Sequence, residues 1–554
     1  MRLDSVRRGA CAFLGAIALV AGCGGGDGAA SGGTVVIGSG QDPKSLFPPT
    51  AETTQARELT ELIFERLADR GQALNTFGDS GFVPRLAQRW EWSPDSLRVT
   101  FHLNPRARWE DGHPVSAGDV KFALDVYADS LTGARERRDL AEVLDSISVG
   151  DSVTCTAWFR SRSPERFDVL VTTLVPLPAH LLRAVPHDSL ATSAFARHPI
   201  GDGPFVLAKW DQDVRLELTR SASYAGTRPA LDRVIWTFSP DAATRFKQLA
   251  AGESDFLENL SVDDATAAGK LPGLRVVRLG SYAYNFLQFN LRDGPGAAAH
   301  PLFGDRALRR ALTMALDRQL LVRSVFDSLG RVGIGPFVRA QWAADTTVAQ
   351  IAFDRAGAEH LLDSLGWRAG PDGFRSRNGR ALAFRLLVPT ASAARLRLSV
   401  LIQEQLRLAG VNVEIEKADI SAMVDRMKHR AFDAVMGGFT SSPSPSGVKQ
   451  TWTSSAAVNG GLNYGRYESK AFDAEIDSAG TAGSLTSARG HYKAANQIIV
   501  NDAPAIWLYE PPVLAGMSTR VRPGEMRADA WWMSIPAWSV TAGKRPARDA
   551  AGTP

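Results

Sequence analysis

The chain has 554 residues, with 63 Lys and Arg, 59 Asp and Glu, and a formal net charge of +4. This length exceeds what one hydrophobic core normally serves, so two or more cores are expected. Hydrophobic residues at 44% and charged residues at 22% are ordinary for a soluble globular protein, and the absence of a long basic run excludes nucleic acid as the expected partner.

The N-terminus has the pattern of an export signal. Three Arg residues precede an apolar stretch over residues 10–21, which is too short to span a bilayer. The stretch ends in Leu-Val-Ala-Gly before Cys23, which is similar to the bacterial lipobox, where the Cys sulfur is lipidated and the chain is cleaved ahead of it. Residues 1–22 are therefore predicted to be a lipoprotein signal peptide, Cys23 the lipid anchor, and residues 23–33 a flexible tether. The alternatives are a plain signal peptide with a chance Cys, or a short buried helix.

Only one of the three cysteines is expected in the folded part of the chain. Cys155 lies in a strand-like stretch over residues 152–158. A lone Cys in such a stretch is expected to be a small buried hydrophobe. Since it has no partner for a disulfide, stability is expected to come from the size of the core.

The first half of the chain predicts strands and a capped helix. Residues 35–37 form a short apolar run, typical of a buried strand, and residues 97–103 alternate as in a half-buried strand. Ser116 and Asp119 have the spacing of a capping box, and apolar residues recur behind them at helical intervals.

The second half predicts longer helices alternating with strands. Apolar residues recur every three or four positions over residues 307–320, which predicts one long amphipathic helix. Residues 396–408 predict another helix, which Gly410 ends, and residues 411–415 alternate as a strand. A helix, a glycine and a strand in close succession are typical of an α/β unit.

Several short motifs follow one another at spacings found in a known family. They are Pro-Arg-Leu-Ala-Gln-Arg-Trp at 84–90, Trp-Glu-Asp-Gly-His-Pro at 109–114, Ile-Gly-Asp-Gly-Pro-Phe at 200–205, Gly-Glu-Ser-Asp at 252–255, Arg-Arg-Ala-Leu at 309–312 and Phe-Asp-Ala-Val-Met-Gly-Gly-Phe at 432–439. The series resembles the bacterial extracellular solute-binding proteins of family 5, the dipeptide-, oligopeptide- and nickel-binding type that serves ABC importers. The resemblance covers about residues 34–538, and the motif residues themselves are expected to be mostly scaffold.

The resemblance implies an α/β fold with two lobes, the type II, cluster C periplasmic-binding-protein-like fold, with an extra subdomain in lobe I. The implied division is lobe I over 34–282 including the inserted subdomain, lobe II over 283–505, a return to lobe I over 506–540, and a disordered tail over 541–554. The chain is expected to cross between the lobes near residues 282–287 and 506–510.

The resemblance also implies a function. The protein would capture a peptide or peptide-like solute between its lobes and deliver it to the transmembrane permease subunits of an ABC importer. It would be a monomer without a cofactor, exported, and held in the periplasm or on the outer face of the cell membrane by its lipid anchor only. Two alternatives remain: the same fold binding an oligosaccharide or metal chelate, or a sensory or surface lipoprotein without import.

One departure from the family bears on the ligand. In peptide-binding relatives, an Asp shortly after Gly-Gly-Trp holds the α-ammonium group of the ligand, which needs an opposite charge when buried. Here Phe439 stands where the Trp is expected, and Ser442 stands where the Asp is expected. Either another acid substitutes, with Asp419 and Glu468 as candidates, or the ligand is not an ordinary free-amino peptide.

Aromatic and polar residues near the expected cleft are the candidate ligand-binding residues. They are Tyr282, Tyr284, Asn285, Phe439, Ser442, Trp452 and Tyr509. Aromatic side chains there would stack on a sugar or line side-chain pockets, and the alternative is that they fill the core. No His-Glu-x-x-His or Gly-x-Ser-x-Gly motif occurs, and the nine histidines show no local metal-ligand spacing, so neither an enzyme nor a metal site is predicted.

Overall fold

A seven-stranded sheet forms the centre of lobe I in the computed structural model, which describes residues 29–541 except 31, 52, 294–297 and 459–460. Its strands, in spatial order, are β13 (Leu274–Leu279), β23 (Val513–Ser518), β12 (Phe256–Leu257), β2 (Thr34–Ser39), β11 (Arg233–Phe238), β10 (Arg215–Arg220) and β9 (Phe205–Asp211). The central strand β2 is buried along its whole length and runs parallel to both of its neighbours. Helices α1 (Thr54–Ile63), α7 (Ala242–Ala250) and α8 (Val262–Ala268) belong to the same lobe.

The extra subdomain of lobe I is a four-stranded antiparallel sheet covered by helices. Its strands are β5 (Ala87–Trp92), β6 (Arg98–Leu103), β8 (Thr154–Phe159) and β7 (Leu144–Asp151), and its helices are α2 (Ala117–Ala128), α3 (Arg137–Val143), α4 (Arg166–Thr173), α5 (Ala179–Leu182) and α6 (Ala194–Arg197). The hairpin of β3 (Ala68–Arg70) and β4 (Phe82–Pro84) lies beside α4. One continuous hydrophobic core joins this subdomain to the main sheet of lobe I, so the two are a single lobe.

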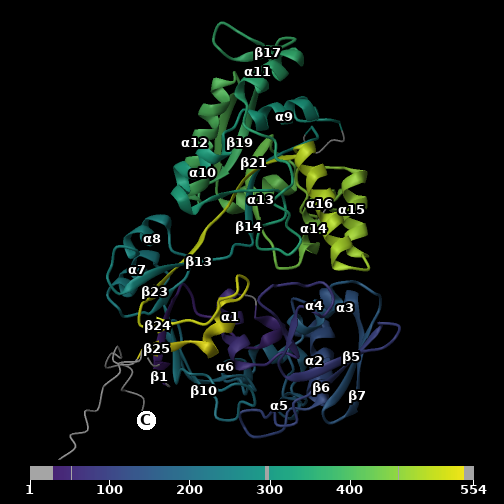
Figure 1. Ribbon diagram of the computed structural model, residues 1–554, viewed down its shortest axis with the longest axis vertical. Coiled ribbons are helices and arrows are strands. Elements are labelled where there is room, and N and C mark those ends of the chain that lie inside the picture. Colours follow the sequence, from purple (N-terminus) through teal and green to yellow (C-terminus); the bar gives the residue numbers. More distant parts are fainter. Residues whose placement is uncertain (1–28, 31, 52, 294–297, 459–460, 542–554) are drawn as a thin grey trace, which may run out of the picture.

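Lobe II is built on a six-stranded mixed sheet. Its strands are β15 (Arg331–Val332), β22 (Ala505–Glu510), β14 (Ala283–Phe289), β21 (Ala434–Thr440), β19 (Ala383–Pro389) and β20 (Asn412–Ala418). Its helices are α9 (Arg306–Met314), α10 (Arg318–Phe326), α11 (Arg355–Ser364), α12 (Ala393–Leu408), α13 (Ile420–Lys428), α14 (Val448–Trp452), α15 (Lys470–Gly480) and α16 (Leu485–Asp502). A small sheet of β16 (Arg368–Ala369), β17 (Arg375–Arg377) and β18 (Arg380–Ala381) lies at the far tip of this lobe (Figure 1).

Two short segments connect the lobes. The first joins β13 to β14 through residues 280–282, and the second joins β22 to β23 through Pro511 and Pro512 (Figure 1). Strand β22 pairs with β14 over most of its length, so residues 506–510 lie in lobe II, and the second crossing comes later in the chain than expected. The physical reason is that proline has no N–H to donate, so the sheet ladder ends where the two prolines begin.

The two ends of the described chain pair with each other. Strand β1 (Ala29–Ala30) lies antiparallel to β25 (Ser539–Thr541), which also pairs with β24 (Val521–Arg522). Residues 29 and 30 were expected to belong to a flexible tether, and this pairing shows that the expected tether is too long. The predicted signal peptide, Cys23 and residues 542–554 lie outside the described residues.

Several local predictions are confirmed and one is wrong. The Ser116–Asp119 capping box opens α2, and α12 is followed by Gly410 at φ +82° and then by β20, which runs parallel to β19. The single helix expected over residues 307–320 is two helices, α9 and α10, because the Asp317 carboxylate accepts a hydrogen bond from the Leu320 N–H at 2.9 Å and so begins a new helix.

Cys155 is buried, and burial raises the pKa of its thiol to about 12. Among the described residues, no helix combines the length and the apolar character that a membrane crossing requires.

Candidate ligand-binding cleft

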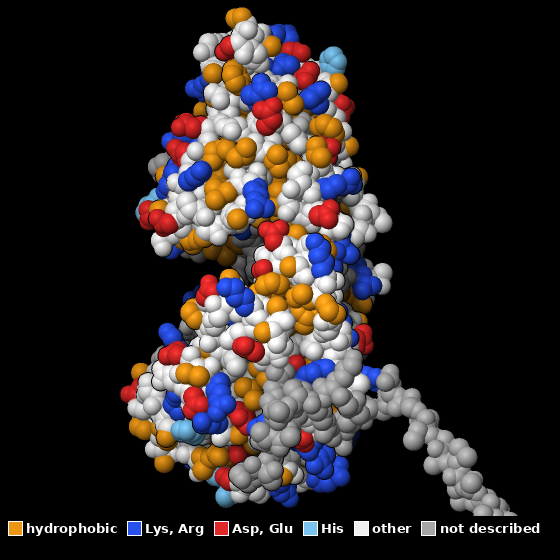
Figure 2. Space-filling view, turned by 90° about the vertical axis from the view of Figure 1, so that its left-hand side faces the viewer, with side chains coloured by type: hydrophobic (Ala, Val, Ile, Leu, Met, Phe, Trp, Pro, Cys, Tyr) orange, Lys and Arg blue, Asp and Glu red, His pale blue; other side chains and the backbone are white. Residues whose placement is uncertain are grey.

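A cavity of about 720 Å³ lies between the two lobes, where the chain crosses from one to the other. Both crossings line it, through residues 279–283 and 511–513. Helix α1 and residues 527–532 contribute from lobe I, and residues 440–443 contribute from lobe II. Figure 2 shows the surface hollowed between the lobes. A solute in this cavity would contact both lobes and both connecting segments, which is the geometry that hinge closure around a ligand requires.

Local sequence explains why residues 440–443 reach the cavity. Strand β21 pairs with β14 as far as Thr440, and the Ser441 N–H donates to the Tyr282 carbonyl at 2.8 Å. Pro443 and Pro445 follow, and they end the strand because they lack the N–H of a continuing ladder. The chain therefore turns beside the first crossing and presents Ser441 and Ser442 to the cavity.

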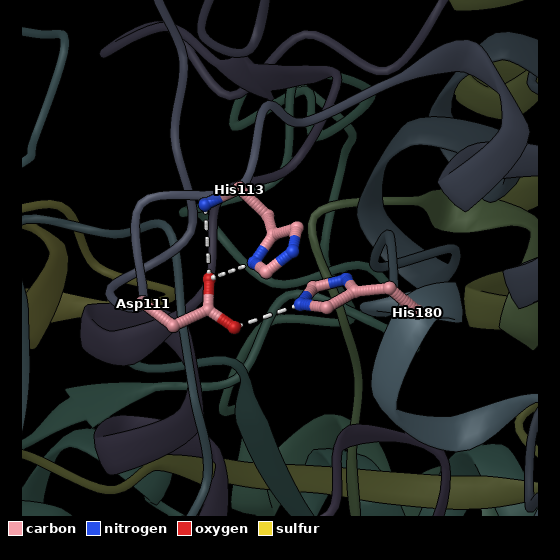
Figure 3. A group of neighbouring side chains, drawn as sticks. All are labelled: Asp111, His113 and His180. Carbon is pink, nitrogen blue, oxygen red and sulfur yellow. Dashed lines mark hydrogen bonds and ion pairs between the residues drawn. The ribbon is translucent and has the colours of Figure 1, made fainter.

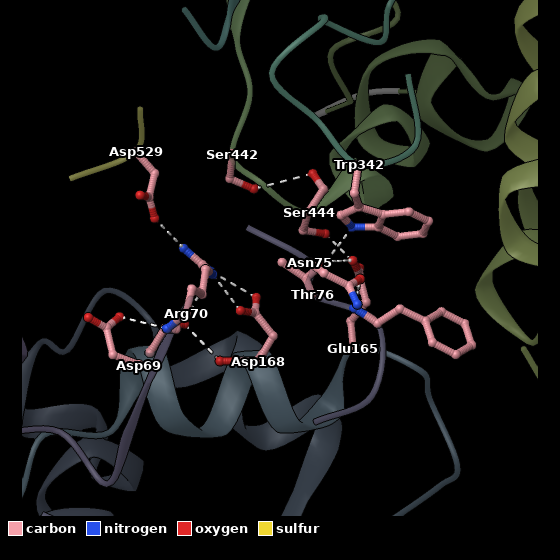
Figure 4. Close-up of polar contacts among 12 residues, drawn as sticks. Asp69, Arg70, Asn75, Thr76, Glu165, Asp168, Trp342, Ser442, Ser444 and Asp529 are labelled. Carbon is pink, nitrogen blue, oxygen red and sulfur yellow. Dashed lines mark hydrogen bonds and ion pairs between the residues drawn. The ribbon is translucent and has the colours of Figure 1, made fainter. Parts of the chain in front are cut away.

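An ion-pair network occupies the lobe I side of the cavity (Figure 4). Arg70 makes a two-point contact with Asp168, at 2.6 and 2.8 Å, and a third contact with Asp529 at 3.2 Å. Arg527 contacts Asp529 at 3.0 Å and Asp69 at 2.9 Å. Burial opposes the charge on Arg70, but Asp168 raises the pKa of its guanidinium. The two guanidinium groups are thus already compensated by three carboxylates, and Arg70, Arg527 and Asp529 of this network line the cavity.

A second group of carboxylates lies beside the cavity without such compensation. Glu258 lines the cavity and is half-buried, and burial raises its pKa. Behind it, Glu58 is 3% exposed and accepts a hydrogen bond from the Trp236 indole at 3.2 Å. Burial, and then repulsion from Glu258, raises the pKa of Glu58. The nearby Trp531 indole acts in the opposite direction and lowers the pKa of Glu258, although the indole N–H makes no hydrogen bond of normal geometry. A cationic group entering the cavity would relieve this unfavourable charge density.

The lobes also touch each other away from the crossings. Glu165, at the start of α4, accepts hydrogen bonds from Thr76 of lobe I at 2.5 Å and from Ser444 of lobe II at 2.6 Å (Figure 4). The Trp342 indole of lobe II donates to the Thr76 hydroxyl at 2.8 Å, and Phe77 packs edge-on against the same indole. Burial raises the pKa of Glu165. We call these five residues the interlobe clasp.

Two of the predicted ligand-binding residues line the cavity. The Tyr282 side chain lies at the first crossing, and its hydroxyl donates to the Ala340 carbonyl at 3.2 Å. Ser442 is exposed and donates to the Ser444 carbonyl at 3.3 Å. Both side chains are placed to contact a solute, and ligand binding by them stays a prediction.

The other predicted residues point away from the cavity. The Trp452 indole donates to the Tyr284 hydroxyl at 2.9 Å inside the lobe II core, and Tyr509 packs on Phe326 with ring centroids 4.7 Å apart. These three aromatics are buried: Tyr284 and Tyr509 lie on β14 and β22, which are buried along almost their whole length, and Trp452 lies on α14. None of them is among the residues that line the cavity. The expectation that these strand-end aromatics face the cleft is therefore corrected: they fill the core.

Asn285 and Phe439 are likewise engaged within lobe II. The Asn285 side-chain carbonyl accepts from the Arg395 guanidinium at 2.7 Å, and Phe439 is half-buried against Phe286, with ring centroids 5.4 Å apart. Neither lines the cavity. Phe439 is thus a packing residue in this structure, not a wall of the cleft.

The acids of the cavity are not the ones expected from the sequence. Asp419 caps α13 by accepting from the Ala422 N–H at 2.9 Å, and Glu468 pairs with Arg292 at 2.8 Å, so neither reaches the cavity. The acidic residues that line it are Glu61, Glu136, Asp139, Glu258 and Asp529. No local motif marks this set, because its members come from segments of lobe I that only the tertiary fold brings together.

Comparison with known proteins agrees with this architecture. The family model of the bacterial extracellular solute-binding proteins, family 5 (middle), matches residues 81–460. The chain belongs to this family. The oligopeptide-binding protein AppA of Bacillus subtilis is 26% identical over 517 residues, covering 91% of this chain and 92% of the relative.

Solved structures of similar proteins share the two-lobed fold. AppA of Bacillus subtilis in complex with a nonapeptide superposes with a TM-score of 0.71, at 24% identity, covering 93% of this chain and 100% of that one. NikA of Brucella suis in complex with Fe(III)-EDTA superposes with a TM-score of 0.77, at 21% identity, covering 92% of this chain and 100% of that one. The predicted α/β fold with two lobes is thus confirmed, and as a family 5 member the protein is a solute-binding protein.

Proposed function

We propose that this family 5 protein binds a peptide or peptide-like solute between its lobes and delivers it to the permease of an ABC importer. The observation that carries this proposal is the cavity bounded by both crossing segments. The similarity to an oligopeptide-binding protein along nearly the whole chain supports the ligand class. The protein acts by binding alone and without catalysis. It is exported, monomeric and anchored to the membrane through Cys23.

We further propose that Glu258 supplies the charge that Ser442 lacks. Its carboxylate lines the cavity, and it forms no ion pair with a basic side chain in the described part of the chain. Its neighbour Glu58 is buried, and the negative charge of Glu258 raises the pKa of Glu58. The α-ammonium group of a peptide placed in the cavity would neutralise Glu258 and so gain a charge-assisted hydrogen bond.

A ligand screen tests the proposed function. A soluble form that begins at Gly24, and so retains β1, is unfolded and refolded to remove carried ligand. Thermal shifts are then recorded with di- to pentapeptides, N-acetylated peptides, oligosaccharides and metal chelates. Ligand at about 100 times its Kd should stabilise the folded protein by about 2.7 kcal/mol. Stabilisation by peptides supports the proposal. A response confined to oligosaccharides or chelates would move the substrate class, and silence from the whole panel would contradict solute capture.

A variant separates the role of Glu258 from the general proposal. Glu258→Gln should weaken the binding of a free-amino peptide about 10-fold or more in calorimetric titration, while its N-acetylated form binds as before. Glu359→Gln, on the exposed face of α11 in lobe II, is the matched control. An equal loss for both peptides would mean that Glu258 supports the cavity without recognising the ammonium group.

A further inference from the structure

Two histidines and an aspartate meet on the surface of the extra subdomain, at the end of lobe I opposite the cleft (Figures 1 and 3). Asp111 and His113 belong to the turn between β6 and α2, and His180 is the second residue of α5. The sequence shows no metal-ligand spacing here because His180 lies far along the chain from the other two. Only the packing of α5 against α2 brings the three side chains together.

The three side chains converge on one point. One carboxylate oxygen of Asp111 lies 2.8 Å from His180 Nε2, and the other lies 3.2 Å from His113 Nδ1. The two imidazole rings stack with centroids 4.2 Å apart and planes inclined at 25° (Figure 3). The three ligand atoms all lie within 4.8 Å of one another. A tetrahedral Zn²⁺ site with Zn–N bonds of about 2.0–2.1 Å separates its ligand atoms by about 3.3 Å, so small side-chain rotations would complete it.

The surrounding backbone holds both arms of the cluster in place. The His113 N–H donates to the Asp111 carboxylate at 3.1 Å, and Gly112 adopts φ +90°, a value that favours glycine. Asp119 joins the two arms, because its carboxylate accepts from the Ala179 N–H at 2.9 Å and from the Ser116 N–H at 2.7 Å. Positions 179 and 116 adjoin α5 and the turn, so the ligands are attached to fixed elements.

The chemistry of the cluster suits a particular class of ion. Two imidazole nitrogens and one carboxylate oxygen are donors that Zn²⁺ and neighbouring transition-metal ions prefer over Mg²⁺ or Ca²⁺. The His113 side chain is 60% exposed, which leaves room for a water ligand and for entry of the ion.

We propose that Asp111, His113 and His180 form a surface site for one divalent transition-metal ion of the zinc class. The site is separate from the cleft and independent of the solute captured there. The bound ion would add a link between the β6–α2 turn and α5, which Asp119 and the contact of Asp111 with His180 already connect. It would therefore also stabilise the extra subdomain against unfolding.

The whole protein, purified in mild detergent without a histidine tag and freed of metal, is titrated with ZnCl₂ by calorimetry and with CoCl₂ by visible absorption. We expect one Zn²⁺ per chain, a Co²⁺ spectrum typical of low coordination number, and an affinity at least about 10-fold lower in His113→Ala or His180→Ala. His187→Ala is the matched control, since His187 contacts Asp129 at 2.8 Å in the same subdomain without a third ligand among the described residues.

Metal-free variants are compared by circular dichroism and thermal unfolding, so that loss of binding is not confused with loss of fold. Absence of saturable Zn²⁺ binding to the wild-type protein would overturn the proposal. So would an unchanged affinity in the His113→Ala/His180→Ala double variant, because that result would place the ion elsewhere, for example in the cleft.

Discussion

The interlobe clasp predicts that Ser444→Ala shifts the protein toward an open form. Ser444 donates one of the two hydroxyl hydrogen bonds that satisfy the buried Glu165 carboxylate, and it is the one that comes from lobe II. A hydrogen bond to a charged group contributes about 1.5–3 kcal/mol, and in the open form water would replace it. Removing it should therefore shift the closure equilibrium by about 10- to 150-fold toward the open form.

Distances between the lobes provide the assay. Spin labels at Leu131→Cys in lobe I and Val400→Cys in lobe II, both on exposed positions, are introduced into the form that begins at Gly24, where Cys155 is buried. Pulsed electron paramagnetic resonance then gives the distance distribution at pH 7 for wild type and variant. Ser478→Ala, a hydroxyl on the outer helix α15, is the control. Identical distributions for Ser444→Ala and wild type would refute the reasoning that this contact favours closure.

Three other predictions concern pH, buried charge and anchoring. Burial in the clasp raises the pKa of Glu165, so the closed form binds a proton more readily than the open form. Closure should therefore be favoured as pH falls from 7 toward 5, and this gain should be lost as pH rises through the raised pKa of Glu165. Glu165→Gln should show no such dependence in the same distance measurement. Asp255→Asn removes the buried negative charge that Arg520 contacts at 2.7 Å, and should lower the free energy of unfolding by about 3–5 kcal/mol in urea titration. A loss below about 1 kcal/mol, as is typical of surface pairs, would contradict this. Cys23→Ser should release the protein from the membrane fraction with an unchanged circular dichroism spectrum, and continued partition into detergent would reject the lipid anchor.

The sequence by itself determined the family, the two-lobed fold and much of the local structure. Some signals act only through neighbouring residues, so the sequence is enough to read them. The Ser116–Asp119 box predicts the start of α2, Gly410 predicts the end of α12, and the alternation over residues 97–103 predicts β6. The family motifs are mostly turns and caps of this kind, and for that reason they identify the scaffold and do not locate the ligand.

The tertiary structure decided which side chains reach the cleft and which groups meet elsewhere. Tyr282 and Tyr284 are two residues apart and both pack in the lobe II core, yet only Tyr282, which precedes β14, also lines the cavity. The surroundings of Glu258 and the meeting of His113 with His180 are both created by segments that are distant in the sequence. No local pattern therefore marks either site. Local spacing determines helices, strands and turns, whereas charge compensation and side-chain convergence are set by which distant surfaces the fold brings into contact.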